Sequence, residues 1–239
     1  MRLTVIGTGY LGATHAACMA ELGHDVLGVD VEPDRIAALR SGQALSHDTR
    51  IGGRFLHAGV GFGGGCLPKD IRAFTARAEE LGVGRALSFL HEVDAINLRR
   101  RERVLALAGE LCPGGPAGHR IAVWGAAFKP DSDDIRDSPA LDIAGRLHRA
   151  GASVSVYDPK AMDNARKLHP ELDYATGPLE AAQGADLILH LTEWPEFRAL
   201  DPRAVAAVAA RRQVVDGRNI LDREDWRAAG WTYRALGRP

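Results

Sequence analysis

The chain has 239 residues, 46% of them hydrophobic and 26% charged, which is the composition of a soluble globular protein with one large or two small domains. Its formal net charge of −1 gives no overall field to attract nucleic acid or an anionic membrane, and no apolar run approaches the roughly 20 residues of a membrane span. Three cysteines lie far apart without a CxxC pair, so we expect no disulfide framework, no bound metal and a cytoplasmic location; they are Cys18, Cys66 and Cys112.

The first forty residues alternate short apolar runs with helical segments. Leu3–Ile6 is predicted to be a buried parallel strand, followed by a helix over Tyr10–Leu22. Asp25–Asp30 is predicted to be a second strand, and Pro33–Arg40 a helix with proline in its first turn. This βαβα opening predicts a truncated N-terminal Rossmann unit, which we assign to residues 1–43.

The alternation stops in the middle of the chain. Residues 41–66 are rich in Gly, Ser and His, and the next predicted helix is Pro68–Leu81. Ser88–Leu111 reads as one long connecting helix whose apolar stripe is interrupted by Asn97 and Arg100. We assign residues 44–115 to a glycine-rich cysteine loop and this helix, and the apolar stripe predicts a homodimer.

The βα alternation resumes in the last part of the chain. Ser138–Ala150 is a predicted helix, and the predicted strands are Ile121–Trp124, Ser153–Tyr157, Asp186–Leu191 and Gln213–Asp216. Strands that alternate with helices form an α/β fold with a doubly wound parallel sheet. We assign residues 116–239 to such a Rossmann-like C-terminal domain.

A glycine motif predicts the cofactor. Gly7, Gly9 and Gly12 fit GxGxxG directly after the first strand, and Asp30 ends the second strand at about the spacing of a ribose ligand. The glycines let the backbone approach a pyrophosphate, and the carboxylate accepts from a 2′-hydroxyl but repels a 2′-phosphate. The carboxylate therefore favours NAD over NADP. The preceding strand, the spacing and the aspartate together favour a bound cofactor over the alternative, a ligand-free glycine turn with an aspartate that only caps a strand.

The segment Gly61–Asp70, GFGGGCLPKD, places Cys66 between a run of glycines and the start of a predicted helix. Its glycines leave the backbone bare for a ligand, and Pro68 starts a helix just after the cysteine, with Lys69 close by. A helix N-terminus and an ammonium both favour thiolate over thiol, so Cys66 is the candidate nucleophile. The alternative is a small buried hydrophobe, which is the interpretation we give to Cys18 and Cys112.

These motifs resemble the UDP-glucose/GDP-mannose dehydrogenase family, and the cysteine segment resembles that of the UDP-glucose 6-dehydrogenases. The resemblance covers nearly the whole chain. The matching segments are the glycine motif with Tyr10, Gly23-His24, Arg50-Ile51-Gly52, Phe55-Leu56, Gly61–Asp70, Gly125–Pro139, Thr192-Glu193-Trp194 and Asp216-Gly217-Arg218-Asn219. Of these, Arg50-Ile51-Gly52 and Phe55-Leu56 favour UDP-glucose over GDP-mannose or UDP-N-acetylmannosamine as substrate.

The resemblance implies a two-step oxidation of a hydroxymethyl group to an acid. NAD takes the first hydride, the cysteine captures the aldehyde as a thiohemiacetal, a second NAD oxidises this to a thioester, and water hydrolyses it. By position, Cys66 is the expected nucleophile, Asp70 helps to organise the catalytic water, and Lys69 lies near the cofactor. The expected NAD-binding residues are Gly7, Gly9, Tyr10, Leu11, Gly12, Asp30, Arg35, Lys69 and Arg136.

The resemblance also implies a substrate site for UDP-glucose or a related nucleotide sugar. The loop around the sugar nucleotide is expected to contain His57, Gly59, Gly61, Phe62 and Gly63, with His57 contributing backbone contacts. Arg50 is expected to reach the substrate across a dimer interface. The expected contacts from the C-terminal domain are Phe128, Lys129 and Arg218, whose cations suit a diphosphate; solvated surface charge is the alternative for each cation.

The sequence departs from the family in one place. Ser41-Gly42-Gln43 runs directly into Ala44–Asp48, which resembles the segment just before Arg50, so the junction has the form of a large internal deletion. In the family, a threonine and a glutamate position the catalytic water, and a lysine and an asparagine stabilise the oxyanion. All four belong to the missing stretch. Three hypotheses follow: a dehydrogenase with impaired activity, a non-catalytic remnant that binds NAD or a UDP-sugar or dimerises with a full-length relative, and a structural fragment without ligand.

Overall fold

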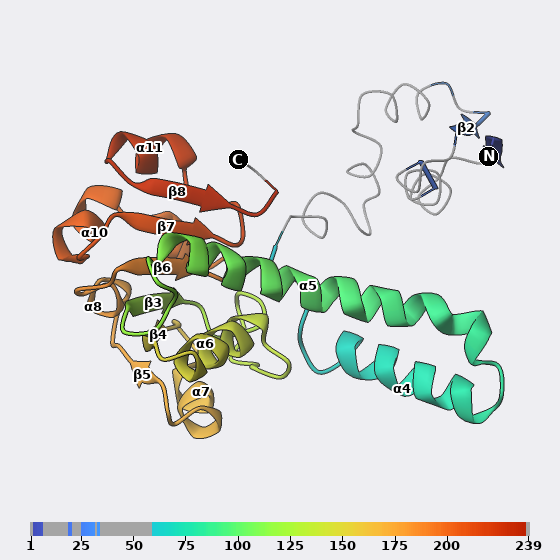
Figure 1. The fold of residues 1–239 in the computed structure, drawn as a ribbon, viewed down its shortest axis with the longest axis horizontal. Coiled ribbons are helices and arrows are strands. Elements are labelled where there is room, and N and C mark those ends of the chain that lie inside the picture. Colours follow the sequence, from blue (N-terminus) through green and yellow to red (C-terminus); the bar gives the residue numbers. More distant parts are fainter. Residues whose placement is uncertain (1, 7–18, 21–24, 32, 34–58, 238–239) are drawn as a thin grey trace. The chain divides into compact units, whose positions relative to one another are not determined.

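The computed structural model describes residues 2–6, 19–20, 25–31, 33 and 59–237, which Figure 1 draws in colour. The chain divides into two compact units, Met1–His57 and Ala58–Pro239. The first unit contains a parallel pair of strands, β1 (Arg2–Ile6) and β2 (Asp25–Val29), at the predicted positions. The predicted burial of the first strand is wrong, because the residues of β1 are exposed or half-buried and Ile6 is 86% exposed. The predicted helices fall almost entirely outside the described residues, although residues 19–20 and Pro33 are helical.

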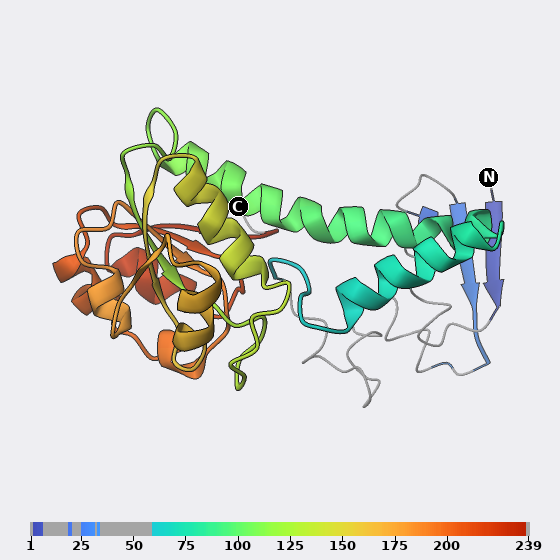
Figure 2. The ribbon, with the colours of Figure 1, turned by 90° about the horizontal axis from the view of Figure 1, so that it is seen from below.

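The second unit begins with a helical hairpin. α4 (Leu67–Glu80) has proline in its first turn and is followed by Gly82, whose φ of +74° suits only glycine without strain. A short 3₁₀ turn, η2 (Gly84–Leu87), leads into α5 (Ser88–Leu111), which is the long helix predicted from the sequence. α4 and α5 pack alongside each other, as both views show (Figures 1 and 2).

A parallel six-stranded sheet follows, in the order β5-β4-β3-β6-β7-β8. The strands are β3 (Arg120–Trp124), β4 (Ser153–Tyr157), β5 (Asp173–Tyr174), β6 (Leu187–His190), β7 (Gln213–Asp216) and β8 (Thr232–Ala235). The chain winds outward from β3 to β5 and then returns to place β6 on the other side of β3. This reversal confirms the predicted doubly wound sheet, and in such sheets ligands bind outside the carboxyl ends of the strands at the point of reversal.

Helices cover both faces of this sheet. α5 contacts α6 (Pro139–Arg149), and Figure 2 shows both on one side. The remaining helices are α7 (Met162–Leu168), α8 (Pro178–Ala181), α9 (Pro195–Arg198), α10 (Pro202–Val208) and α11 (Arg223–Ala228). Four of the helices named here, α6, α8, α9 and α10, begin with proline, which lacks the amide hydrogen that a first turn leaves unbonded.

The core of the second unit is built on strands that are apolar on both faces. All four residues of β6 are buried, as expected for a central parallel strand. Trp124 at the end of β3 is fully buried, stacks on Phe197 with ring centroids 5.7 Å apart, and meets Trp226 edge-on at 6.1 Å. Its indole nitrogen donates to the carbonyl of Pro178, 3.0 Å away. These contacts fix the end of β3, from which the candidate site residues Phe128 and Lys129 follow.

Candidate active site

Cys66 is exposed and lies at the N-cap of α4. Its carbonyl accepts the amide of Asp70 at 2.8 Å, the first turn of the helix. Lys69 and Asp70 form an exposed ion pair at 2.9 Å, and the hydrogen bond to Asp70 raises the pKa of Lys69. The predicted setting of the cysteine at a helix start beside Lys69 is therefore present.

The other described cysteine has a different environment. Cys112 is 1% exposed at the end of α5, and burial, followed by the charge of Asp186, raises the pKa of its thiol. Both effects disfavour thiolate, so Cys112 acts as a small core residue, as the sequence predicted. Cys18 lies outside the described residues.

The glycines before Cys66 allow the segment to press against the loop that follows β3. A Cβ on Gly63 would lie 2.3 Å from the carbonyl oxygen of Asp137, and one on Gly64 would lie 2.9 Å from the ring of Phe128. The amide of Gly64 donates to the carbonyl of Arg136 at 2.8 Å. Because only glycine permits this approach, the sequence of the cysteine segment is explained by a contact with residues more than sixty positions away.

Arg136 lies against the residue next to the cysteine. A Cβ on Gly65 would come within 2.4 Å of the Arg136 guanidinium. That guanidinium pairs with Asp134 at 2.6 Å, and its hydrogen bonds lower the pKa of Asp134. Nearby, the ammonium of Lys129 lies over the Phe128 ring, 5.5 Å from its centroid. The structure thus gathers Phe128, Lys129 and Arg136 around the cysteine segment.

Arg218 comes to the same region from the end of β7. Its side chain is 12% exposed and pairs with Glu193 at 2.9 Å. Nε donates to the carbonyl of Leu191 at 2.8 Å and Nη2 to that of Phe128 at 3.3 Å. Burial lowers the pKa of Arg218, with Glu193 opposing, but arginine stays charged at neutral pH. A Cβ on Gly59 would lie 2.7 Å from Nη1, so this cation also supports the start of the glycine loop.

The loop that carries Arg218 is anchored by a buried carboxylate. Asp216 is 0% exposed and accepts hydrogen bonds from His190 Nδ1 at 2.8 Å and from the Tyr233 hydroxyl at 2.7 Å. The loop amides of Arg218 and Asn219 also donate to it, at 2.9 and 2.8 Å. Burial alone would raise the pKa of Asp216, but these hydrogen bonds outweigh it and hold the pKa below its usual value.

Two polar residues of α5 hold the site together. Asn97 is 3% exposed and clamps the backbone of Phe62, accepting its amide at 2.7 Å and donating to its carbonyl at 2.9 Å. Arg101 is 4% exposed and pairs with Asp137 at 2.7 Å. Arg72 of α4 reaches the same carboxylate at 3.0 Å. The cysteine helix, the long helix and the loop containing Arg136 are therefore joined through Asp137.

Comparison with known proteins gives the family. The sequence profile of the UDP-glucose/GDP-mannose dehydrogenase central domain matches residues 16–99, and that of the family's UDP binding domain matches residues 122–223. A UDP-glucose 6-dehydrogenase of Rhizobium meliloti is 42% identical over 82% of this chain and 45% of its own length. The chain belongs to the UDP-glucose/GDP-mannose dehydrogenase family.

Other relatives of this dehydrogenase family agree. A UDP-glucose 6-dehydrogenase of Pseudomonas aeruginosa is 36% identical over 89% of this chain and 46% of its own. The structure of a UDP-glucose dehydrogenase from Pyrobaculum islandicum superposes with a TM-score of 0.67 and 27% identity, covering 98% of this chain and 58% of that one. Members of the family are NAD-dependent. This chain spans about half the length of the curated relatives it matches.

Apart from Asp30, the predicted site residues fall into two groups. Those gathered in the second unit are Gly59, Gly61, Phe62, Gly63, Cys66, Lys69, Asp70, Phe128, Lys129, Arg136 and Arg218. Those outside the described residues are Gly7, Gly9, Tyr10, Leu11, Gly12, Arg35, Arg50 and His57. Asp30 directly follows Val29, which pairs with Ile6, the last residue before the glycine motif. The chemical role of each residue stays a prediction.

The sequence analysis missed the residues that support this candidate site. It treated Asn97 only as an interruption of the apolar stripe, whereas that interruption is the clamp on Phe62. Arg101 and Asp137 carried no signal on their own. A polar residue at a helix position that should be buried was the available clue, because such a residue must find a partner in the fold.

Within the described part of the chain, two further features bear on the class of site. No group of three or more His, Cys, Asp or Glu side chains there is arranged to hold a metal ion. None of the helices in those ranges is both long enough and apolar enough to cross a membrane.

We predict that replacing Gly63 with alanine lowers the free energy of unfolding of the second unit by about 1–3 kcal/mol, because its methyl group meets a backbone carbonyl that no rotamer change can move. Urea denaturation followed by tryptophan fluorescence measures this, since Trp124, Trp194, Trp226 and Trp231 all lie in that unit. Hydrogen exchange at the Gly64 amide should also accelerate.

A control for this substitution lies in the same unit. A Cβ added to Gly109 of α5 would meet nothing within 4 Å, so Gly109→Ala should instead stabilise the unit by about 0.5–1 kcal/mol. Equal effects of the two substitutions would show that the tight contact at Gly63 does not hold the segment in place.

Proposed function

We propose that this chain is an NAD-dependent dehydrogenase that oxidises UDP-glucose to UDP-glucuronate in the cytoplasm, at a rate reduced by the internal deletion. The observation that carries the proposal is the exposed Cys66 at the start of α4, on a glycine segment packed against Phe128 and Arg136. The family membership and the UDP-glucose 6-dehydrogenase relatives supply the substrate class.

The residues around Cys66 support a covalent route. Its thiolate adds to the aldehyde carbon of the oxidised sugar to form a thiohemiacetal; loss of a hydride from that carbon leaves a thioester, and water releases the acid and the thiolate. Asp70, one turn along α4, positions the water, and Arg136 and Lys69 provide positive charge beside the sulfur. Thiolate suits both steps because it is a strong nucleophile and a tolerable leaving group.

The described part of the first unit fits the cofactor. The register Ile6↔Val29 places Asp30 at the edge of the strand pair where the glycine motif follows in sequence, which is the arrangement of a dinucleotide-binding βαβ unit. NAD would accept the hydrides of both oxidation steps. The residues proposed to bind NAD are Asp30, Arg136, Lys69, Gly7, Gly9, Tyr10, Leu11, Gly12 and Arg35.

The substrate contacts are proposed from the second unit. Lys129 is exposed beside the Phe128 ring and is available to a diphosphate, whereas Arg218 is already paired with Glu193. We assign Lys129 the direct phosphate contact. Arg218 holds Phe128 and Gly59 in position and adds positive potential, and the loop Gly59–Gly63 with His57 encloses the nucleotide sugar.

A homodimer is part of the proposal. The hairpin of α4 and α5 exposes large apolar side chains, namely Phe74, Leu81, Val83, Phe89 and Ile96. An apolar surface of this kind is typical of a protein–protein contact. A second copy of the chain would cover it and bring Arg50 of one protomer to the substrate of the other.

NADH formation tests the proposal. The purified chain is incubated with UDP-glucose and NAD, and absorbance should show two NADH formed per UDP-glucose consumed, at a rate well below that of the full-length relatives. The second hypothesis, a non-catalytic binder, follows from the expected loss of the family's water-positioning and oxyanion-stabilising residues at the junction after Gln43. It predicts no NADH but a higher melting temperature with NAD or UDP-glucose, because a ligand of the folded state stabilises it. If neither NADH formation nor a shift in melting temperature is observed, both hypotheses are wrong.

A further inference from the structure

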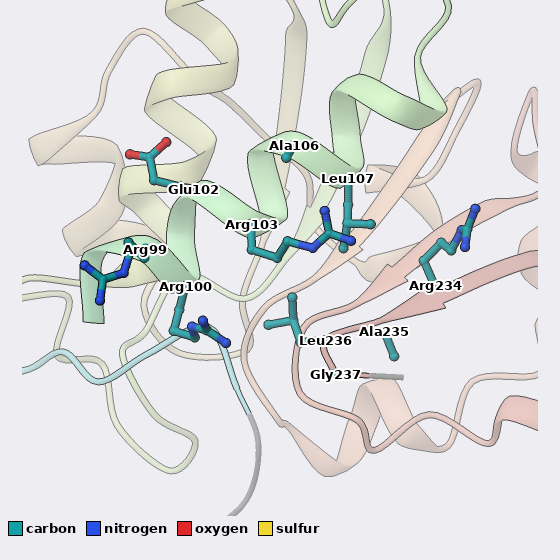
Figure 3. Close-up of a pocket in the computed structure, with 10 residues that line it drawn as sticks. All are labelled: Arg99, Arg100, Glu102, Arg103, Ala106, Leu107, Arg234, Ala235, Leu236 and Gly237. Carbon is teal, nitrogen blue, oxygen red and sulfur yellow. The ribbon is translucent and has the colours of Figure 1, made fainter. Parts of the chain in front are cut away.

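A cavity lies away from the cysteine segment. It has a volume of about 700 Å³ and opens between the middle of α5 and the carboxyl end of β8. Figure 3 shows its side chains: Arg99, Arg100 and Arg103 come from α5, and Arg234 comes from β8. None of its lining residues belongs to the stretch 122–223 matched by the family's UDP binding domain.

The cavity carries a surplus of positive charge. Its lining contains four arginines and one carboxylate, Glu102, which pairs with Arg146 at 2.6 Å. Arg99 and Arg103 pair with Glu92 and Glu110 of the same helix. Arg100 and Arg234 are both exposed, and neither has an ion-pair partner among the residues that the structure describes. Two arginines without an ion-pair partner in the described ranges therefore line the cavity from separate elements.

The floor of the cavity is apolar. Leu107 is 3% exposed and Leu236 is 6% exposed, and Ala106 and Ala235 lie beside them. A volume between about 300 and 1,000 Å³, an apolar lining and a few placed polar groups are typical of small-molecule sites. The combination selects a ligand with a flat or apolar part and an anionic part.

We propose that this cavity binds a nucleoside diphosphate. Guanidinium groups bind phosphate through paired charge-assisted hydrogen bonds, so Arg100 and Arg234 would take one phosphoryl group each, with Arg103 at the side of the diphosphate. The base and ribose would cover Leu107 and Leu236. This site is separate from the proposed dehydrogenase site, and the proposal does not depend on that function.

Contacts between the cavity and the loop after β7 connect such a ligand to the candidate active site. The carbonyl of Leu236 accepts Asn219 Nδ2 at 3.2 Å, and Asn219 is adjacent to Arg218. A ligand packed on Leu236 would therefore bear directly on the Asp216–Asn219 loop.

Calorimetric titration of the full chain with ADP, UDP and inorganic pyrophosphate tests the proposal. We expect saturable binding of ADP and pyrophosphate, weakened at least about tenfold by the double variant Arg100→Gln/Arg234→Gln, since each lost charged hydrogen bond is worth about a factor of ten or more. Both arginines are exposed, so the variant should fold. Arg198→Gln removes an exposed arginine of α9 outside the cavity and should change affinity less than twofold.

Three results would overturn the proposal. They are no saturation with any of the three ligands up to about 10 mM, equal weakening by Arg198→Gln, and binding that persists in the double variant but is lost in Lys129→Gln. The last result would place the ligand at the candidate dehydrogenase site instead.

Discussion

Replacement of Cys66 by serine should slow NADH formation from UDP-glucose by on the order of 10³-fold or more, the scale seen when an essential nucleophile is removed. A serine hydroxyl is almost fully protonated at neutral pH, and no described histidine forms a hydrogen bond with the side chain of Cys66. An alkoxide is also a poorer leaving group than a thiolate in the hydrolytic step. The loss should therefore appear in turnover and not in substrate binding.

The matched control is the other described cysteine. Cys112 is only 1% exposed in the core, and Cys112→Ala should keep turnover within about twofold while lowering stability by about 1 kcal/mol. Iodoacetamide should alkylate the exposed Cys66 first, and UDP-glucose should protect it. A Cys66→Ser chain that forms NADH as fast as the Cys112→Ala chain would rule out the thioester route.

Much of the second unit was predictable because its strands are buried on both faces. β3, β4, β6 and β7 each match a predicted strand to within one or two residues at either end. The two strands that the sequence analysis missed are the outer ones, β5 and β8. β5 is two residues long, and β8 alternates exposed Arg234 with buried Tyr233 and Ala235, so neither forms a continuous apolar run.

The candidate site was predictable where its chemistry is local. Pro68 and the glycines of 61–65 indicate a bare backbone leading into a helix, and the structure has both. The supports were not predictable, because they join residues far apart in the chain: Asn97 to Phe62, and Arg72 and Arg101 to Asp137. The ion pair between Arg218 and Glu193 was not predictable for the same reason, because it joins two loops that are distant in the sequence.

Replacement of Asp216 by alanine should lower the free energy of unfolding of the second unit by about 3–5 kcal/mol, the usual cost of removing one partner from a buried charged network. The carboxylate joins β6, β7 and β8 through His190 and Tyr233, and it fixes the loop that carries Arg218. Its loss leaves several buried donors without an acceptor. Turnover should fall as well, because Arg218 would no longer be held against Phe128.

Urea denaturation monitored by tryptophan fluorescence measures this cost, and Asp201 provides the control. Asp201 caps α10 by accepting the amide of Arg203 at 2.9 Å, at an exposed position. Removal of such a cap costs about 1 kcal/mol. A cost for Asp216→Ala no larger than that for Asp201→Ala would mean that the buried network contributes little to the fold.

The same network fixes the sign of a pH dependence. Because the folded-state pKa of Asp216 lies below its unfolded value, its ionisation stabilises the fold above the usual aspartate pKa, and this contribution is lost as pH falls through the folded value. The difference in free energy of unfolding between the unaltered chain and Asp216→Ala should therefore be constant from pH 7 to about pH 5 and shrink below about pH 4. A difference that grows in acid would mean that burial, and not the hydrogen bonds from His190 and Tyr233, dominates the pKa of this carboxyl.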